Sequence, residues 1–407
     1  MAGKKTLLLL GGSRYVLPVI RAAHGLGARV ITCDYLPGNY GHRFSDGYVN
    51  ASIVDREAVL AAARAVRADG IMSFAADPGV VSAAYAAECL GLPFQGSYDA
   101  VAILQDKARF RGFLRENGFS SPWFFSAGSV PDAMRRADEP RYPVIVKPVD
   151  LAGSKGVSRV DAPSGLAGAV GRALSLSLSG RCIVEQFIER RGCSSDSDCF
   201  CENGAMTCVS FSSQLFDDKA PNPYVPSGYV MPSQMPAGAQ AALASELQRL
   251  CDLLHLRSGI FNVETRVAKD GTPYLMEVSP RGGGNRLSEL LRRSSGVDLV
   301  RAAVQVALGM PAEGVSMPRY QGIWYEHVLH ARRDGVFGGL RYAPGFREAH
   351  VVGEQVWVRR GERVCSLTGA NRSFGTVTLR FDTMRELDGF LAEPDRYMSV
   401  EICEGSL

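Results

Sequence analysis

The chain has 407 residues, which is enough for two or three domains with extensive hydrophobic cores. With 46% hydrophobic and 21% charged residues, its composition is that of a globular protein. The net charge of +3 is too small to indicate a nucleic-acid partner, and no apolar run reaches the roughly eighteen residues that would indicate a membrane span.

Ten cysteines are irregularly spaced, and the first apolar run, residues 6–10, stops at Gly11 before it reaches the length of a signal peptide. We therefore expect a cytoplasmic protein whose cysteines are free. The densest cysteine cluster lacks the paired spacing of a zinc site, so metal binding there is a minor alternative. This cluster comprises Cys193, Cys199, Cys201 and Cys208.

Residues 1–105 alternate strands and helices and are expected to form an N-terminal α/β domain. Apolar strands are expected over 7–10, 29–33 and 70–74, with a helix over 58–66. Continuous apolar strands that are bounded by glycine and separated by helices are typical of a doubly wound parallel sheet.

The turn Gly11-Gly12-Ser13 after the first strand leaves three interpretations open. It lacks G-x-G-x-x-G, so an NAD(P)-dependent oxidoreductase is a minor alternative, although Asp34 lies about where a ribose-binding acid would be. The glycines could simply allow a tight turn. Alternatively, this turn and the loop 75–79, which contains Asp77, both follow strand ends and together form part of a substrate site.

Residues 106–312 change to a mixture of antiparallel strands and helices, after a linker at 92–96. We expect helices over 106–118, 164–176, 237–254 and 286–307, and strands over 144–148, 182–188, 259–268 and 272–279. Turn residues Glu202-Asn203-Gly204 and Asp270-Gly271 predict two hairpins. The remaining residues, 313–407, predict a small C-terminal domain of short strands with one helix near 383–392.

Three segments of the central region are suited to a nucleotide. Lys147 ends a buried strand, where its charge could meet a phosphate. The loop 152–157 contains Gly153, Ser154 and Gly156, whose small size lets backbone N–H groups approach phosphate oxygens, and Lys155 adds charge. The strand end 184–188 offers backbone donors and acceptors to an adenine edge.

The strongest signal is a pair of glutamates on the two arms of one predicted hairpin. Glu264 and Glu277 each lie inside an apolar strand, and cross-strand pairing would place both carboxylates on one face. Two neighbouring anions are unfavourable unless a cation or a shared proton intervenes. Carboxylate oxygens combined with nucleotide phosphates suit Mg²⁺, so we expect a magnesium site between these glutamates.

Residues just after this hairpin are candidates for the reacting centre. Arg281 follows the second strand and could stabilise negative charge on a transferring phosphoryl group. The flexible turn Gly282-Gly283-Gly284 lets backbone donors approach the same centre. Asn285 and Arg286 end this turn and, with Asp77, are the candidate substrate-binding residues.

Taken together, these positions resemble the ATP-grasp superfamily, in the branch of biotin carboxylase, glycinamide ribonucleotide synthetase and amino-acid ligases. The positions that match in order are Lys107, Lys147, the loop 153–157, the strand end 185–188, Glu264, Glu277 and Arg281. The resemblance covers the chain to about residue 310. It implies that two α+β subdomains, about 106–188 and 189–312, clamp ATP between them.

The resemblance also implies roles for these side chains. Lys107 and Lys147 would contact phosphates with the loop residues Gly153, Ser154 and Gly156, and Glu185, Gln186, Phe187 and Ile188 would contact adenine. Glu264 and Glu277 would hold Mg²⁺, or Mn²⁺ in its place, and Arg281 and Lys155 would be catalytic.

Two positions depart from the family pattern. The family usually has Asn two residues after the second metal glutamate, whereas this chain has Ser279, so the number of Mg²⁺ ions is open and Ser279 is a third candidate ligand. The family's ribose-binding acid has no clear match, and Glu189, Asp196 or Asp198 could replace it. The segment 216–224 is either the border of the acceptor pocket or a rigid surface loop.

We therefore expect a ligase that uses ATP and Mg²⁺ to convert a carboxylate into an acyl phosphate, which an amine or a thiol then attacks. ADP and phosphate would be released. The expected partners are a small carboxylate and a small nucleophile, with neither nucleic acid nor membrane, and the resemblance allows a homodimer. A carboxylase that forms carboxyl phosphate and a non-catalytic nucleotide-binding protein are the alternatives.

Overall fold

The computed structural model describes residues 3–404 and begins with a parallel sheet of four strands in the order β3-β2-β1-β4. These strands are β1 (Thr6–Leu10), β2 (Arg29–Asp34), β3 (Gly47–Asn50) and β4 (Gly70–Ser73). Leu7 and Leu9 pack with helices α1 (Leu17–Gly25) and α10 (Leu299–Ala307). Leu8 and Leu10 pack with α2 (Arg56–Val66) and α3 (Val80–Leu90). The expected doubly wound sheet is therefore confirmed, because alternate residues of one apolar strand serve two helical layers.

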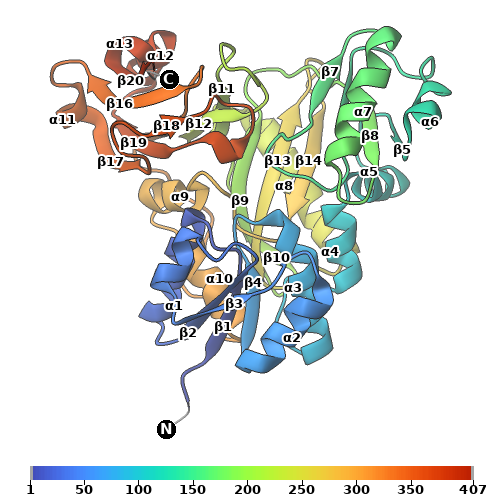
Figure 1. Cartoon of the computed structure of the whole chain (residues 1–407), viewed down its shortest axis with the longest axis vertical. Coiled ribbons are helices and arrows are strands. Elements are labelled where there is room, and N and C mark those ends of the chain that lie inside the picture. The colour runs from blue at the N-terminus through green and yellow to red at the C-terminus, as the bar shows by residue number, and fades with distance from the viewer. Residues whose placement is uncertain (1–2, 405–407) are drawn as a thin grey trace.

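One covering helix of this sheet comes from a distant part of the sequence. Helix α10 lies against β4 so closely that a Cβ on Gly70 would be 2.2 Å from the carbonyl oxygen of Ala307. Figure 1 shows α10 beside α1 and the blue N-terminal strands. This packing ties the N-terminal sheet to the region that carries the glutamate hairpin.

The central part of the chain forms two antiparallel sheets. The first has the order β5-β8-β6-β7, with β5 (Phe124–Ala127), β8 (Cys182–Gln186), β6 (Val144–Pro148) and β7 (Ser158–Val160), and packs on α6 (Val130–Met134) and α7 (Leu166–Leu176). The second has the order β10-β9-β13-β14, with β10 (Ala205–Cys208), β9 (Ser195–Glu202), β13 (Gly259–Val267) and β14 (Pro273–Ser279), and packs on α8 (Ala237–Leu253). Helices α4 (Tyr98–Gln105) and α5 (Lys107–Glu116) precede the first sheet in sequence.

The C-terminal region contains a five-stranded sheet and a three-stranded sheet. The larger has the order β11-β12-β15-β19-β17, from β11 (Ser213–Phe216), β12 (Pro226–Met231), β15 (Ile323–Leu329), β19 (Gly375–Phe381) and β17 (Val351–Val356). The smaller has the order β18-β16-β20, from β18 (Arg363–Val364), β16 (Gly335–Tyr342) and β20 (Met398–Cys403). Helices α11 (Phe346–His350), α12 (Met384–Ala392) and α13 (Pro394–Tyr397) complete this region. Figure 1 shows the sheet of β9, β13 and β14 in the middle of the molecule, between this red region and the green region of α7.

Several elements differ from the sequence-based expectation. The helix expected over 286–307 is two helices, α9 (Leu287–Ser295) and α10, because Gly296 adopts φ 83° and Asp298 caps α10 by accepting a hydrogen bond from the Arg301 amide at 3.0 Å. Strand β3 and helices α3 and α4 were not expected. Strands β11 and β12 precede residue 312 in sequence but belong to the C-terminal sheet, in which β11 pairs with β12 and β12 pairs with β15. The hairpins at 202–204 and 270–271 and the late helix α12 are confirmed.

All ten cysteines lie within the described residues, and none forms a disulfide there. Within residues 3–404 no helix is both long enough and apolar enough to cross a membrane.

Candidate functional site

A row of three acidic side chains crosses the central sheet. Glu264 of β13 pairs in register with Glu277 of β14 on one side and with Asp196 of β9 on the other. Cross-strand partners share a face, so the hairpin places both glutamates together as the sequence indicated. The register of β13 and β14 shifts immediately after Glu264, and an irregularity of this kind re-aims side chains at a site.

The electrostatics of this row favour a bound cation. Burial and the neighbouring Glu277 raise the pKa of Glu264. Lys107 lies 3.2 Å from Glu277 and also donates to the carbonyl oxygen of Leu151 at 2.8 Å. Burial opposes the charge of Lys107, but Glu277 and Asp77 outweigh it and raise the lysine pKa. An additional divalent cation would relieve the repulsion between the two glutamates.

The donor set fits Mg²⁺ rather than a metal held by protein alone. Among residues 3–404 no three His, Cys, Asp or Glu side chains are arranged to hold a metal ion by themselves. Mg²⁺ typically takes one or two carboxylates and completes its shell with phosphate oxygens and water. Glu264 and Glu277 supply such a pair of carboxylates.

A second polar row lies one step further along the same strands, on the same face. Asn262 of β13 pairs with Ser279 of β14 and with Asp198 of β9. The amide nitrogen of Asn262 donates to Asp196 at 2.8 Å and to Asp198 at 3.2 Å. We did not single out Asn262 from the sequence, although its position two residues before Glu264 on an alternating strand could have indicated it.

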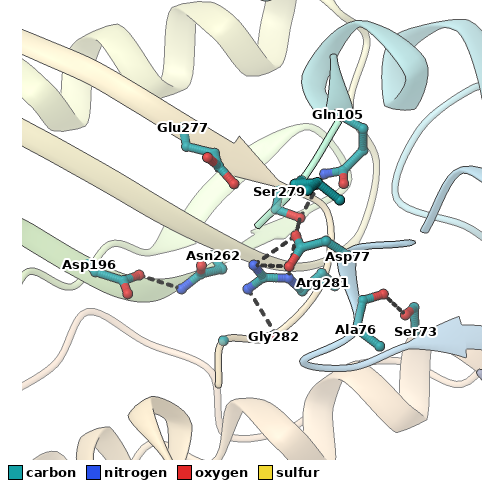
Figure 2. A network of polar contacts seen from close by, with 12 residues as sticks. Ser73, Ala76, Asp77, Gln105, Asp196, Asn262, Glu277, Ser279, Arg281 and Gly282 are labelled. Carbon is teal, nitrogen blue, oxygen red and sulfur yellow. Dashed lines mark hydrogen bonds and ion pairs between the residues drawn. The ribbon is translucent and has the colours of Figure 1, made fainter. Parts of the chain in front are cut away.

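Ser279 is turned away from the glutamate pair and towards the N-terminal sheet. Its hydroxyl donates to Asp77 at 2.9 Å and accepts from the side-chain amide of Gln105 at 2.7 Å. Figure 2 shows these contacts beside Glu277. The serine therefore connects the hairpin to the loop after β4.

Arg281 forms a two-pronged ion pair with the same aspartate. Its Nε and Nη2 atoms donate to the two carboxylate oxygens of Asp77 at 2.9 and 2.8 Å, and Nη1 donates to the carbonyl oxygen of Gly282 at 3.2 Å (Figure 2). Burial would raise the pKa of Asp77, but Arg281 and Ser279 outweigh it and lower that pKa. The structure thus brings together Asp77, a candidate substrate residue, and Arg281, the candidate catalytic residue.

The triple-glycine turn is packed against two other segments. Gly282 forms a bridge with Phe74, the Ala75 amide donates to the Gly282 carbonyl at 3.0 Å, and a Cβ on Gly282 would be 2.1 Å from the Phe74 ring. The Gly283 amide donates to Asp198 at 2.7 Å. Burial raises the pKa of Asp198, whose role here is to anchor the turn.

Asn285 and Arg286, the other candidate substrate residues, face the C-terminal region. The hydroxyl of Tyr15 donates to Asn285 at 3.0 Å, and the Asn285 amide donates to the hydroxyl of Tyr229 at 3.0 Å. The Arg286 guanidinium donates to Glu289 at 3.2 Å and lies 3.8 Å from the buried Glu326. Asn285 and Arg286 therefore contact residues of the N-terminal turn, of β12 and of β15.

Lys147 and Glu185 contact each other across neighbouring strands β6 and β8. The Lys147 ammonium is paired with one oxygen of Glu185, and the buried Arg111 donates to the other at 3.0 Å. Burial would raise the pKa of Glu185, but Arg111 and Lys147 outweigh it and hold the pKa at about 2. Burial lowers the pKa of Lys147. The side chain of Glu185 is thus engaged in an ion pair, and its backbone lies in the sheet in register with Phe124 and Ile145.

The backbone of the expected adenine segment is partly occupied. The Gln186 amide donates to the Trp123 carbonyl at 2.8 Å, and the Phe187 amide donates to the Pro143 carbonyl at 3.1 Å. In the described part of the chain the Ile188 amide has no such partner, although its carbonyl oxygen accepts from Arg266 at 3.1 Å. Of the backbone amides of residues 186–188, that of Ile188 therefore remains to donate a hydrogen bond to a ligand.

The glycine loop contains several left-handed backbone conformations and lies against the C-terminal region. Gly153, Ser154 and Gly156 have φ values of 72°, 58° and 72°. The Ala370 amide donates to the Gly153 carbonyl at 3.3 Å, and the Ser154 hydroxyl donates to the Tyr224 carbonyl at 2.8 Å. Lys155 is exposed.

The glycine turn after β1 is filled by the chain itself. A Cβ on Gly12 would be 2.3 Å from the His42 ring, and the Gly41 amide donates to the Gly12 carbonyl at 2.8 Å. Asp34 accepts from the Leu36 amide at 2.9 Å and from the Asn39 side chain at 3.0 Å. The turn at Gly12 and the carboxylate of Asp34 are thus engaged by the protein itself, which argues against the NAD(P) alternative.

Comparison with known proteins shows what the central region is similar to. Residues 140–289 match the family model described as the ATP-grasp domain. An L-amino acid ligase from Bacillus licheniformis superposes with a TM-score of 0.80 over 99% of this chain and 100% of that chain, at 22% sequence identity. The described residues therefore have the fold seen in that structure.

Two curated proteins match over shorter stretches. Carnosine synthase 1 of Gallus gallus is 36% identical over 124 residues, which are 29% of this chain and 13% of that protein. The carbamoyl phosphate synthase large chain of Thermoanaerobacter sp. (strain X514) is 25% identical over 233 residues, which are 56% of this chain and 20% of that protein. The chain thus spans a fifth or less of the length of these relatives.

Proposed function

We propose that the chain, whose residues 140–289 match the ATP-grasp family model, is an ATP- and Mg²⁺-dependent ligase that joins a small carboxylate to an amine through an acyl phosphate. The γ-phosphoryl group of ATP is transferred to the carboxylate, ADP leaves, and the nucleophile then displaces phosphate. A thiol is the alternative nucleophile. Bicarbonate, which would form carboxyl phosphate, is the alternative acid.

The side chains around the glutamate pair are assigned roles in this reaction. Glu264 and Glu277 hold Mg²⁺, which when bound neutralises phosphate charge. Lys107 and the loop of Gly153, Ser154 and Gly156 contact the phosphates, with Lys147 and Lys155 adding positive charge. Residues 185–188 receive the adenine, and Arg281 stabilises charge on the transferring phosphoryl group.

Asn262 extends the proposed metal site. It lies directly opposite Ser279, and its amide nitrogen is committed to Asp196 and Asp198, which leaves the amide oxygen as a donor on the same face as the two glutamates. Ser279 is committed to Asp77 and Gln105. We therefore assign the third protein oxygen ligand to Asn262 in place of Ser279.

The observation that carries the proposal is the register of Glu264 opposite Glu277, with Lys107 at 3.2 Å from Glu277. Two partly buried carboxylates on one face of a sheet, with the lysine of α5 beside them, form a site for a metal-bound polyphosphate. The non-catalytic alternative predicts the same binding without turnover, so turnover is the quantity to measure.

The proposal is tested by ADP release from ATP and Mg²⁺ with a panel of carboxylic acids, bicarbonate included, and hydroxylamine as a general nucleophile. We expect one class of acid to stimulate ADP release and to yield a hydroxamate. Glu277→Gln should reduce this rate by at least about 1,000-fold, because an interaction made to the transferring phosphate is lost. Glu246→Gln, which removes a surface carboxylate on α8, should leave the rate unchanged. Tight MgADP binding without turnover for any acid would support the non-catalytic alternative.

A further inference from the structure

The ion pair between Asp77 and Arg281 joins opposite charges where the proposed carboxylate must bind. Arg281 follows β14, which carries Glu277, and Asp77 follows β4 of the N-terminal sheet. Any acid that receives a phosphoryl group beside Glu277 must lie near this guanidinium. In the structure the fork of Arg281 is already filled by the carboxylate of Asp77 at 2.9 and 2.8 Å.

The surroundings hold Asp77 in this position. The loop that carries it is shaped by a hydrogen bond from the Ser73 hydroxyl to the Ala76 carbonyl at 2.6 Å, and Ala75 has φ 52° (Figure 2). Ser279 gives Asp77 a further hydrogen bond. The Asp77 side chain is 17% exposed and that of Arg281 is 8% exposed, so the pair is reached from solvent at the aspartate.

An acid that binds Arg281 must take the place of Asp77 on the guanidinium. The displaced carboxylate then lacks its partner, and an unpaired, largely buried charge is strongly unfavourable. A ligand that carries a positively charged group next to its carboxylate gives both Arg281 and Asp77 a new partner. An α-amino acid has this arrangement, because its ammonium group is attached to the carbon next to the carboxylate.

We propose that the acid activated by this protein is an α-amino acid, whose carboxylate binds Arg281 and whose ammonium group binds Asp77. The inference rests on the proposed ligase function and adds the substrate class. Asp77 is then a specificity-determining residue, since acids without the amino group leave it unpaired. A purely structural role for Asp77, in fixing the N-terminal sheet to the hairpin, is the competing explanation.

The two explanations differ in how Asp77→Asn changes substrate preference. The experiment measures hydroxamate formation with ATP, Mg²⁺ and hydroxylamine for the standard amino acids and, for each, the acid that lacks the α-amino group. We expect the wild-type protein to prefer at least one amino acid over its desamino counterpart by about 100-fold or more in kcat/KM. In Asp77→Asn that preference should fall to less than about 10-fold, mainly through a higher KM for the amino acid. The desamino acid should react as well as before or better.

The controls separate this inference from folding and from the proposed function. Asp99→Asn removes an exposed acid of α4 and should retain the wild-type preference. Thermal unfolding and MgADP binding of Asp77→Asn show whether the variant is folded. Equal loss of activity towards both acids in a folded Asp77→Asn, or a wild-type protein that does not prefer amino acids, would overturn the inference. If no acid yields a hydroxamate with any variant, the proposed ligase function itself is wrong.

Discussion

Glu185 is a buried residue whose charge is balanced by two cationic neighbours. It is buried with the Arg111 guanidinium on one oxygen and the Lys147 ammonium on the other. These cations hold the pKa of Glu185 at about 2, below its ordinary value of 4.5. A carboxyl with a lowered pKa stabilises the fold above its unfolded pKa, and this contribution is lost as the pH falls towards the folded value.

Glu185→Gln should therefore have a pH-dependent effect on stability. At pH 7 the variant leaves Arg111 and Lys147 without a counter-charge, and we expect a loss of about 3–5 kcal/mol in the free energy of unfolding. Between pH 6 and pH 3 the difference from wild type should shrink by about 2 kcal/mol, because the carboxyl of the unfolded wild-type chain takes up a proton while that of the folded protein stays ionised. Urea unfolding of both proteins across this pH range measures the difference in their free energy of unfolding. A stability difference that does not change with pH would show that Glu185 does not titrate as the ion pairs require. Glu246→Gln serves as the surface control.

Single residues also show how far the sequence alone could predict the site. Alternation along two strands is enough to place Glu264 beside Glu277, because strand geometry is local. It could not show that Lys147 pairs with Glu185 or that Ser279 turns towards Asp77, since those contacts join elements that are distant in sequence. Asn262 was missed because an amide on a strand forms no motif of its own, and only its spacing of two residues from Glu264 could have indicated it.

The triple-glycine turn is the element that joins the N-terminal sheet to the glutamate hairpin. Gly282 pairs with Phe74, and Gly283 lies under Asn262 and Asp198, so side chains at either position would collide with fixed groups. A Cβ on Gly284 would meet nothing within 4 Å. The three adjacent glycines therefore differ in whether the structure has room for a side chain at each position.

This difference predicts graded effects of alanine in one turn. Gly282→Ala places its Cβ 2.1 Å from the Phe74 ring and should displace Arg281, with a loss of about 100-fold in kcat/KM and of about 1–3 kcal/mol in stability. Gly283→Ala, with its Cβ 2.7 Å from Asn262, should behave similarly. Gly284→Ala is the matched control and should retain activity within about threefold. Equal activities of the three variants would mean that the turn is not a rigid part of the site.

At the scale of elements the sequence predicts long strands and helices better than their ends. The apolar periodicity over 286–307 continues through Gly296, so the break between α9 and α10 is set by the left-handed glycine and the cap at Asp298. The pairing of β12 with β15 is not predictable from local pattern, because nearly one hundred residues separate the two strands.

The whole molecule brings the glycine loop into contact with the C-terminal region. Asn222 bridges the two, because its side-chain amide donates to the Ser154 carbonyl at 3.3 Å and to the Thr368 carbonyl at 3.1 Å. The segment 216–224, for which a pocket border and a surface loop were the alternatives, therefore connects the phosphate loop to the C-terminal region.

Asn222→Ala should loosen the glycine loop without disturbing the glutamate hairpin. We expect faster hydrogen exchange of residues 151–157 in the absence of nucleotide and a KM for ATP that is raised by about 10-fold, because the loop must be ordered on binding. Asn50→Ala, at an exposed position of β3, is the control. Unchanged exchange in Asn222→Ala would show that the C-terminal region does not restrain the loop.

The central claim, that ATP activates a carboxylate at the glutamate pair, is tested most directly by following carboxylate oxygen. The acid selected by the hydroxylamine panel is labelled with oxygen-18 in its carboxyl group and incubated with ATP, Mg²⁺ and the nucleophile. Our account predicts one labelled oxygen in each molecule of inorganic phosphate, because the oxygen that accepts the phosphoryl group leaves with it. Phosphate without label, despite product formation, would contradict an acyl phosphate.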